Sequence, residues 1–248
     1  MSLSLPDSSL GSEPLDDALA AELERLIAER RPADALDLLD PMGGFRKIDT
    51  LERPFLAPWL VQIWIQVGSY RGLRAIEAPL PPELAEARQR FLADGPTPVP
   101  IPRGTLAEVR AIATDAGVRG LVRELAHAHL GLAEFDLRVD ERLAHIECAE
   151  ALAAELEDSA LRSLALAYRA RLDLHLGELD DARDEAEDAR ELGLAHAEPR
   201  AAVIGIAVLA ALDNDRVALA EAHTRLAQLG FAPDAFGLSP AGPPQEGV

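Results

Sequence analysis

The chain has 248 residues, enough for one large domain or two small ones. Its 43 acidic side chains outnumber the 24 basic ones, giving a net charge of -19, which argues against nucleic acid as a direct partner, because duplex binding relies on Lys and Arg neutralising phosphates. A hydrophobic content of 48% excludes a disordered acidic chain, and the abundance of Ala, Leu, Arg and Glu with only 4% aromatic residues excludes an all-β fold.

The sequence carries no sign of export or membrane insertion. Cys148 is the single cysteine, which excludes an internal disulfide framework and fits a reducing compartment. Residues 1–7 lack the basic and apolar regions of a signal peptide, and the apolar window 55–67 is too short to cross a bilayer. We therefore expect a cytoplasmic protein that makes no contact with membranes. The scarcity of lysine (Lys47 alone) beside abundant Ala, Arg, Gly and Pro indicates a bacterial source.

Apolar residues at helical spacing, interrupted by Gly and Pro, predict an all-α protein. Residues 1–14 and 231–248 lack this periodicity and are predicted to be disordered tails. The proline-rich stretch 95–104 is predicted to be an extended linker and a possible hinge. Twelve helices and no strand are predicted: from residue 15 to the break at 30–32, then 33–39, 53–67, 70–78, 83–93, 105–116, 118–133, 140–157, 160–176, 179–192, 198–212 and 216–229.

The predicted breaks between helices recur every 35–38 residues. A period of this length built on helix pairs indicates an α-solenoid, in which each hairpin buries its apolar face against its neighbours. A compact, irregular helical bundle is the alternative. The breaks that define the period are Arg30, Gly68, Gly104, Val139, Gly177 and Asn214.

Several of these residues resemble the tetratricopeptide repeat. The run 177–182 is similar to the turn between that family's two helices, followed by small second-helix residues at Ala182, Ala186 and Ala189 and a closing turn at 192–193. A shift of 37 residues places Gly177 on Asn214 and Gly193 on Gly230, and Leu60, Trp64 and the turn 68–70 resemble an earlier hairpin. Arg169 and Asp173 depart from the family, which prefers Leu and Tyr there. The resemblance implies a right-handed superhelix of about six helical hairpins over residues 15–230.

In that family the first helix of each hairpin lines a concave groove that binds ligands. The resemblance therefore implies a row of candidate groove residues, several of them hydrogen-bond donors that suit a partner's carboxylates. Among them, Arg171 and His175 are four residues apart and are expected to share a face. The candidate groove residues are Gln62, Gln66, Arg123, His129, Arg171 and His175.

Residues with catalytic or metal-binding chemistry form no recognisable motif. His127 and His129 point about 200° apart on a helix and cannot share an ion, whereas His145 and Cys148 could, but a single cysteine is too few for a zinc deaminase signature. Nucleophile-elbow and phosphate-loop motifs are missing. The eight carboxylates of 178–191 are expected on the outward arc of a helix whose alanines face inward.

We therefore predict no catalytic residue, metal or cofactor, and a non-enzymatic scaffold that binds a peptide or helix of another protein as a monomer or homodimer. Two alternatives stay open. One is a regulatory helical-repeat module of a signalling or transcription regulator, and the other is a helical enzyme that uses the region of His145 and Cys148.

Overall fold

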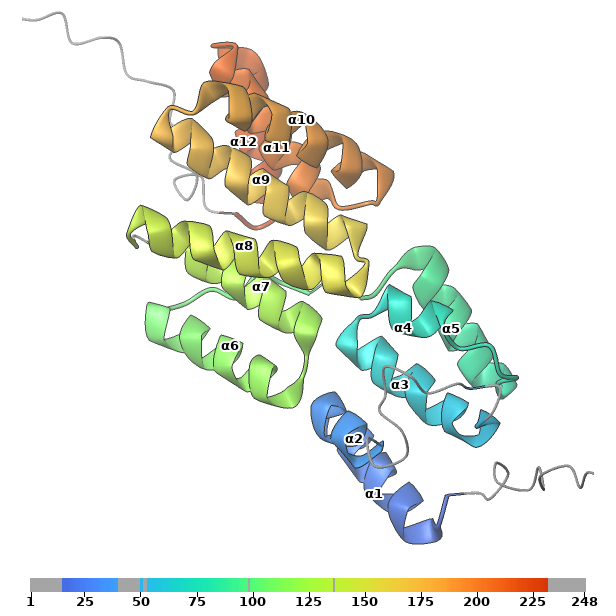
Figure 1. Ribbon diagram of the computed structural model, residues 1–248. Coiled ribbons are helices and arrows are strands. Elements are labelled where there is room, and N and C mark those ends of the chain that lie inside the picture. The colour runs from blue at the N-terminus through green and yellow to red at the C-terminus, as the bar shows by residue number, and fades with distance from the viewer. Residues whose placement is uncertain (1–14, 40–49, 51–52, 98, 136, 232–248) are drawn as a thin grey trace, which may run out of the picture. The chain divides into compact units, whose positions relative to one another are not determined.

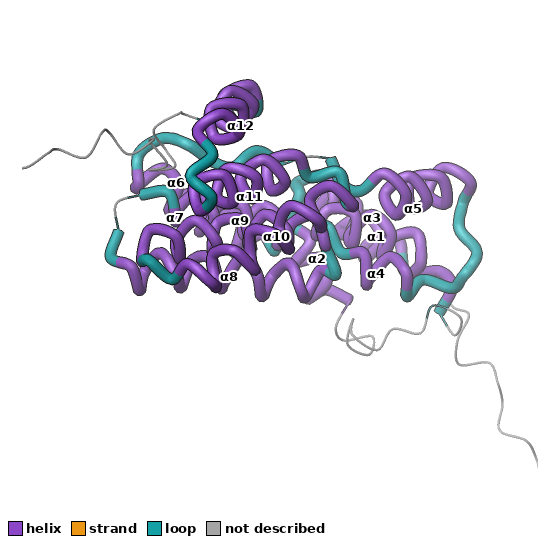
Figure 2. The backbone as a smooth tube through the Cα atoms, turned by 90° about the horizontal axis from the view of Figure 1, so that it is seen from above, coloured by secondary structure: helices purple, strands orange, loops and turns teal. Residues whose placement is uncertain are grey.

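The computed structural model describes residues 15–39, 50, 53–97, 99–135 and 137–231 (Figure 1). In these ranges the chain forms twelve α-helices and one short 3-10 helix, and no strand (Figure 2). The all-α prediction is confirmed. The predicted tails fall outside the described ranges, except that Phe231 is described and buried. None of the described helices is both long and apolar enough to cross a bilayer.

The chain divides into two compact units, a first unit of residues 1–99 and 114–124 and a second unit of residues 100–113 and 125–248. The first boundary lies inside the proline-rich stretch 95–104. The hinge expected there stays a prediction.

Helix α3 is the centre of the first unit. It contacts α1, α2, α4 and α5, and five of its eleven residues are buried. Such a helix is apolar on most sides because neighbours surround it. The helices of this unit are α1 (Asp17–Ala28), α2 (Pro32–Leu39), α3 (Ala57–Val67), which follows the 3-10 helix η3 (Pro54–Leu56), α4 (Tyr70–Arg74) and α5 (Pro82–Asp94).

The turn between α3 and α4 uses a left-handed glycine and a serine cap. Gly68 has φ 85°, and the Ser69 hydroxyl accepts a hydrogen bond from the Gly72 amide at 2.9 Å. Helix α4 ends at Arg74, so the predicted helix 70–78 is too long. The reason is a competing partner: the buried Thr50 hydroxyl accepts hydrogen bonds from the amides of residues 77 and 78, which fixes them outside a helix.

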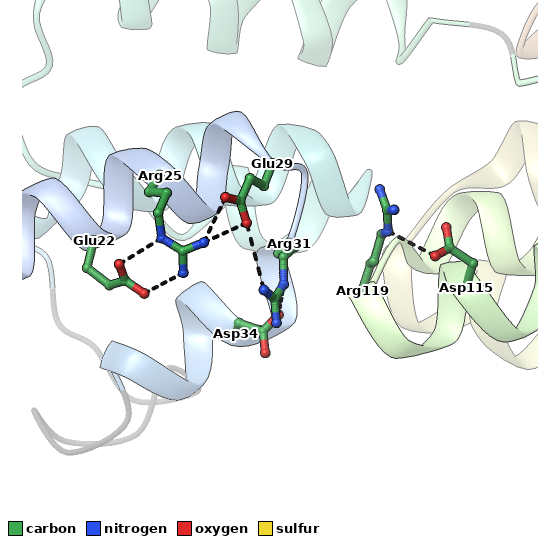
Figure 3. Close-up of polar contacts among 7 residues, drawn as sticks. All are labelled: Glu22, Arg25, Glu29, Arg31, Asp34, Asp115 and Arg119. Carbon is green, nitrogen blue, oxygen red and sulfur yellow. Dashed lines mark hydrogen bonds and ion pairs between the residues drawn. The ribbon is translucent and has the colours of Figure 1, made fainter.

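A chain of exposed ion pairs joins α1 to α2 across their turn (Figure 3). Arg25 binds Glu22 through two nitrogens and also reaches Glu29 at 2.7 Å, while Arg31 pairs with Asp34 at 2.7 Å. These groups are about half exposed, so solvent screens them and they contribute little to stability. The buried side chains of α1 and α2 hold the hairpin, and the ion pairs cover its surface.

Helices of the second unit pack in chain order. Helix α8 packs on α9, α9 on α10, α10 on α11 and α11 on α12, and α11 also contacts α9. Figure 1 shows α8, α9 and α10 lying side by side in this sequence. The helices are α6 (Leu106–Arg119) and α7 (Val122–Ala133), each divided between the two units, then α8 (Val139–Leu156), α9 (Ser159–Leu176), α10 (Leu179–Ala195), α11 (Pro199–Leu212) and α12 (Arg216–Gln228).

Two predicted breaks are wrong because the glycines concerned lie inside helices. Helix α6 runs through Gly117 to Arg119, and the chain turns at Gly120, which has φ 75° and lies against Ala33. Helix α10 continues through Gly193, which is buried against α11. Gly193 therefore marks a close approach between helices, Gly117 is an exposed helix residue, and the turn lies at Gly120, where φ is positive.

The regular spacing of breaks also changes in the structure. Gly177 and Asn214 do turn the chain with positive φ, as expected from their resemblance. Gly104, however, lies in the non-helical segment between α5 and α6, and Val139 is the first residue of α8. The tight turn between α8 and α9 is made by Glu157 (φ 56°) instead. The packing of successive helices is observed, and the superhelical tetratricopeptide arrangement remains a prediction.

Two glycine substitutions should have opposite effects on stability. At Gly205 in α11 an added Cβ would lie 2.6 Å from the Ala186 carbonyl oxygen, so Gly205→Ala should destabilise the protein by about 1–3 kcal/mol. Gly117 is exposed within α6, so Gly117→Ala should stabilise by about 0.5–1 kcal/mol. Urea denaturation followed by circular dichroism measures both, and an unchanged Gly205→Ala variant would contradict the close packing of α10 and α11.

Candidate functional site

The candidate groove residues of the first unit donate hydrogen bonds to backbone carbonyls. Gln66 donates from Nε2 to the backbone oxygen of Ile27 at 2.7 Å, which satisfies a carbonyl in the last turn of α1. Gln62 donates to the Pro58 oxygen of its own helix at 3.2 Å. Arg123 is buried, and its guanidinium donates to the Thr97 backbone oxygen at 2.9 Å. These contacts give the three side chains structural roles.

The candidate residues of the second unit lie in different environments. Arg171 is buried, whereas His175, one turn further along α9, is exposed. The two therefore do not present one continuous binding face. The reason is that α8, α10 and α11 all pack on α9 and cover most of it, and only its last turn projects beyond them. His129 lies apart from both, on α7 against α8.

A cluster of charged and polar side chains, which we call the polar cluster, lies inside the second unit. The Tyr168 hydroxyl donates a hydrogen bond to the Glu134 carboxylate. Arg200 binds Glu198 through two nitrogens, each 2.6 Å from a carboxylate oxygen. The second of these nitrogens also lies 3.5 Å from Nε2 of His127, which is fully buried. The cluster comprises His127, Glu134, Tyr168, Arg171, Glu198 and Arg200 and joins α7, α9 and the start of α11.

Burial shifts the pKa of two members of this cluster, Tyr168 and Arg171. It raises the pKa of Tyr168 well above its ordinary value of 10, and the adjacent Glu134 carboxylate raises that pKa further. The phenol therefore remains neutral and keeps its proton for the hydrogen bond. Burial also lowers the pKa of Arg171. Charges enclosed among apolar helices are tolerated only when paired in a fixed geometry, so the cluster specifies how α7, α9 and α11 meet.

Most members of the polar cluster were missing from the sequence prediction. Arg171 was assigned to an open groove, although Tyr168 three residues earlier shares its helix face and is also buried. Glu198 and Arg200 flank the proline that begins α11, where a carboxylate can cap the first turn; Glu198 indeed accepts from the Arg200 amide at 3.2 Å. The sequence Glu-Pro-Arg at 198–200 is the local signal from which this part of the polar cluster could be predicted.

His129 and His145 form a second polar contact, between α7 and α8. Their Nδ1 atoms are 3.0 Å apart, so the Nδ1–H of one imidazole donates a hydrogen bond to the Nδ1 of the other. His145 therefore pairs with His129, while Cys148, three residues away, is exposed. Within the part of the chain that the structure describes, no three His, Cys, Asp or Glu side chains gather closely enough to hold a metal ion.

Arg169 links three helices through carboxylates. It lies 2.9 Å from Glu150 and 3.4 Å from Glu147 on α8, and 3.7 Å from Glu185 on α10. Glu185 is the one member of the acidic run 178–191 that is not exposed, so the predicted outward arc holds for the other seven. Burial, together with a hydrogen bond to Asp173, raises the pKa of Glu185 to about 8.

No protein-family model matches the chain, and comparison with curated proteins and with solved structures gives no match either. Function must therefore be argued from the residues and their packing.

The histidine pair should make stability sensitive to mild acid. Burial and the neighbouring imidazole lower the pKa of His129, and burial and Arg110 lower that of His145 despite the opposing charge of Glu141. The folded state therefore binds protons at these histidines less readily than the unfolded chain, whose histidines titrate at about pH 6.5. The free energy of unfolding accordingly falls as the pH drops below that value. Replacing one imidazole should reduce this loss.

The measurement is the free energy of unfolding from urea titrations between pH 7.5 and 5 for the wild type and His145→Gln. His175→Gln, a change at an exposed position of α9, is the matched control and should leave the pH dependence unchanged. An equal pH dependence in the wild type and His145→Gln would show that the pair is not proton-linked.

Glu185→Gln should stabilise the protein at alkaline pH. With its pKa raised from 4.5 to about 8, the folded state holds a proton that the unfolded chain has released. Wild-type stability therefore falls as the pH rises from about 4.5 to 8, and a difference of one in pKa corresponds to about 1.4 kcal/mol. The advantage of the glutamine variant should grow over that range and then level off. Chemical denaturation at pH 5, 7 and 9 tests this, with exposed Glu187→Gln as control; an advantage independent of pH would contradict it.

Proposed function

We propose that the protein is a non-enzymatic interaction module that binds a peptide or helix of another protein on the second unit. The observation that carries this proposal is the packing of α11 on both α10 and α9. A helix that contacts the two preceding helices extends an array by one step, and arrays built this way present extended surfaces for partners. The resemblance of the turns at Gly177 and Asn214 to tetratricopeptide turns supports the same conclusion.

The proposed binding face is formed by those side chains of α7, α9 and α11 that neighbouring helices leave at least partly exposed. These three correspond to the first helices of successive hairpins. The polar cluster supports this choice because it fixes these three helices relative to one another. A surface held rigid before binding loses less conformational freedom when a partner docks. His175 is the exposed member of the predicted groove set on these helices, and Arg171 lies buried beneath the surface.

The net charge of -19 favours a partner segment that carries some basic character, because opposite charges speed encounter. We therefore expect a cytoplasmic protein partner whose association weakens as salt rises.

A test of this function selects ligands without assuming their identity. Random peptides displayed on phage are selected against the immobilised protein, and the contacts of each selected peptide are mapped by hydrogen exchange. Peptides with micromolar affinity should protect α7, α9 and α11, and His175→Ala should weaken them at least threefold. His196→Ala, an exposed histidine at the turn between α10 and α11, is the matched control and should leave affinity unchanged. Protection confined to the first unit, or no selected peptide, would contradict the proposal.

A further inference from the structure

An extended segment, which we call the strap, lies against helices of the second unit. The strap comprises residues 100–104 and has no helical structure. Ile101 is buried, with 7% of its surface exposed. Prolines at 100 and 102 restrict φ and favour an extended backbone. The strap therefore has the form of a bound peptide.

Helix α7 is adapted to this contact by a glycine. A Cβ built on Gly131 would lie 2.8 Å from the Pro102 backbone oxygen and 3.4 Å from Cγ2 of Ile101. No other residue fits there without moving the strap, although glycine is unfavourable inside a helix. Val109 of α6, fully buried, lies against the same position at 3.4 Å. Glycine at position 131 therefore lowers the local stability of α7 at the point where the strap backbone contacts this helix.

Arg103, which follows Pro102 in the strap, contacts Phe231 just beyond α12. The Arg103 guanidinium lies 5.2 Å from the centre of the Phe231 ring, a distance at which a cation is attracted to an aromatic face. Phe231 follows α12, is 4% exposed, and donates its amide to the Leu226 oxygen at 2.9 Å. Arg103 itself is exposed, so this contact can open without uncovering a buried charge.

We propose that the strap is an intramolecular ligand occupying a peptide site formed by Val109, Gly131 and Phe231. The site takes an extended segment with an aliphatic residue, a proline and an arginine in succession, as Ile101, Pro102 and Arg103 supply. This inference rests on the proposed function and names the class of peptide that the module binds. A partner with the same pattern displaces the strap, which makes the strap a competitive regulator.

The strap is covalently attached next to its site, so a partner with the same pattern must compete with it. A segment joined by a short linker is present at its site at an effective concentration of about 1 mM. A free peptide making the same contacts therefore binds measurably only when the strap is weakened, or when it is itself present at about that concentration.

The experiment weakens the strap and supplies the same peptide in trans. The variant Ile101→Ser/Arg103→Ala removes the buried side chain and the guanidinium, and a fluorescent peptide of residues 97–105 is titrated by anisotropy. The variant should bind this peptide at least tenfold more tightly than the wild type does, and adding Phe231→Ala should remove the binding. Ile112→Ser/Arg216→Ala makes the same composition change at exposed positions and is the matched control. Circular dichroism reports whether each variant is folded.

A second measurement needs no variant. Trypsin cleaves after Arg103 only when the strap leaves its site, so peptide 97–105 at millimolar concentration should accelerate this cut in the wild type. A control peptide with serine in place of Ile101 keeps the arginine, so it competes for trypsin equally, and it should not accelerate the cut. Unchanged cleavage, or a folded strap variant that binds no better than its control, would overturn the inference. If displayed peptides still bind α7, α9 and α11 in that case, the proposed function stands and the strap inference alone fails.

Discussion

Close contact between α10 and α11 determines where the other helices of the second unit lie. Added Cβ atoms on Gly193 and Gly205 would lie 2.7 Å from the Ala202 amide nitrogen and 2.6 Å from the Ala186 carbonyl oxygen, so backbone meets backbone across this interface. Ala186 and Ala189 are fully buried in the same interface. Small residues permit this approach, and α9 can then contact α10 and α11 together. The sequential array follows from that contact.

Polar groups between these helices add specificity to an interface of small residues. Alanine surfaces resemble one another, so they do not by themselves select one register. The polar cluster and the partly buried carboxylates around Arg169 tolerate few alternative registers, because sliding a helix would leave buried or partly buried charges unpaired. The same groups bring proton-linked behaviour: the pKa of Glu185 is raised to about 8 by burial and that of His129 is lowered by burial. The same buried polar groups therefore contribute both to the stability of the fold and to its dependence on pH.

The sequence predicted the helices well and the role of individual residues less well. Period and breaker residues place the twelve helices of the described ranges, because these signals are local. The sequence predicts breaks at Gly117 and Gly193 because it does not distinguish a glycine in a turn from one inside a helix, whether exposed like Gly117 or packed against another helix like Gly193. Arg171 was predicted to be accessible, yet α9 is covered by three neighbours, which is a property of packing. The position of the strap depends on the contact between Gly131 and Pro102, which no local sequence pattern predicts.

Helices α10 and α11 touch through their backbones, and nuclear Overhauser effects measure this contact directly. In a sample with labelled glycine, arginine and alanine, cross-peaks are expected between the Gly205 Hα and Arg190 amide protons and between the Gly193 Hα and Ala202 amide protons. These pairs follow from Cβ positions 3.1 Å from the Arg190 nitrogen and 2.7 Å from the Ala202 nitrogen. Both cross-peaks should be strong in the folded protein. Their absence from a well-dispersed spectrum would contradict the array and the binding face built on it.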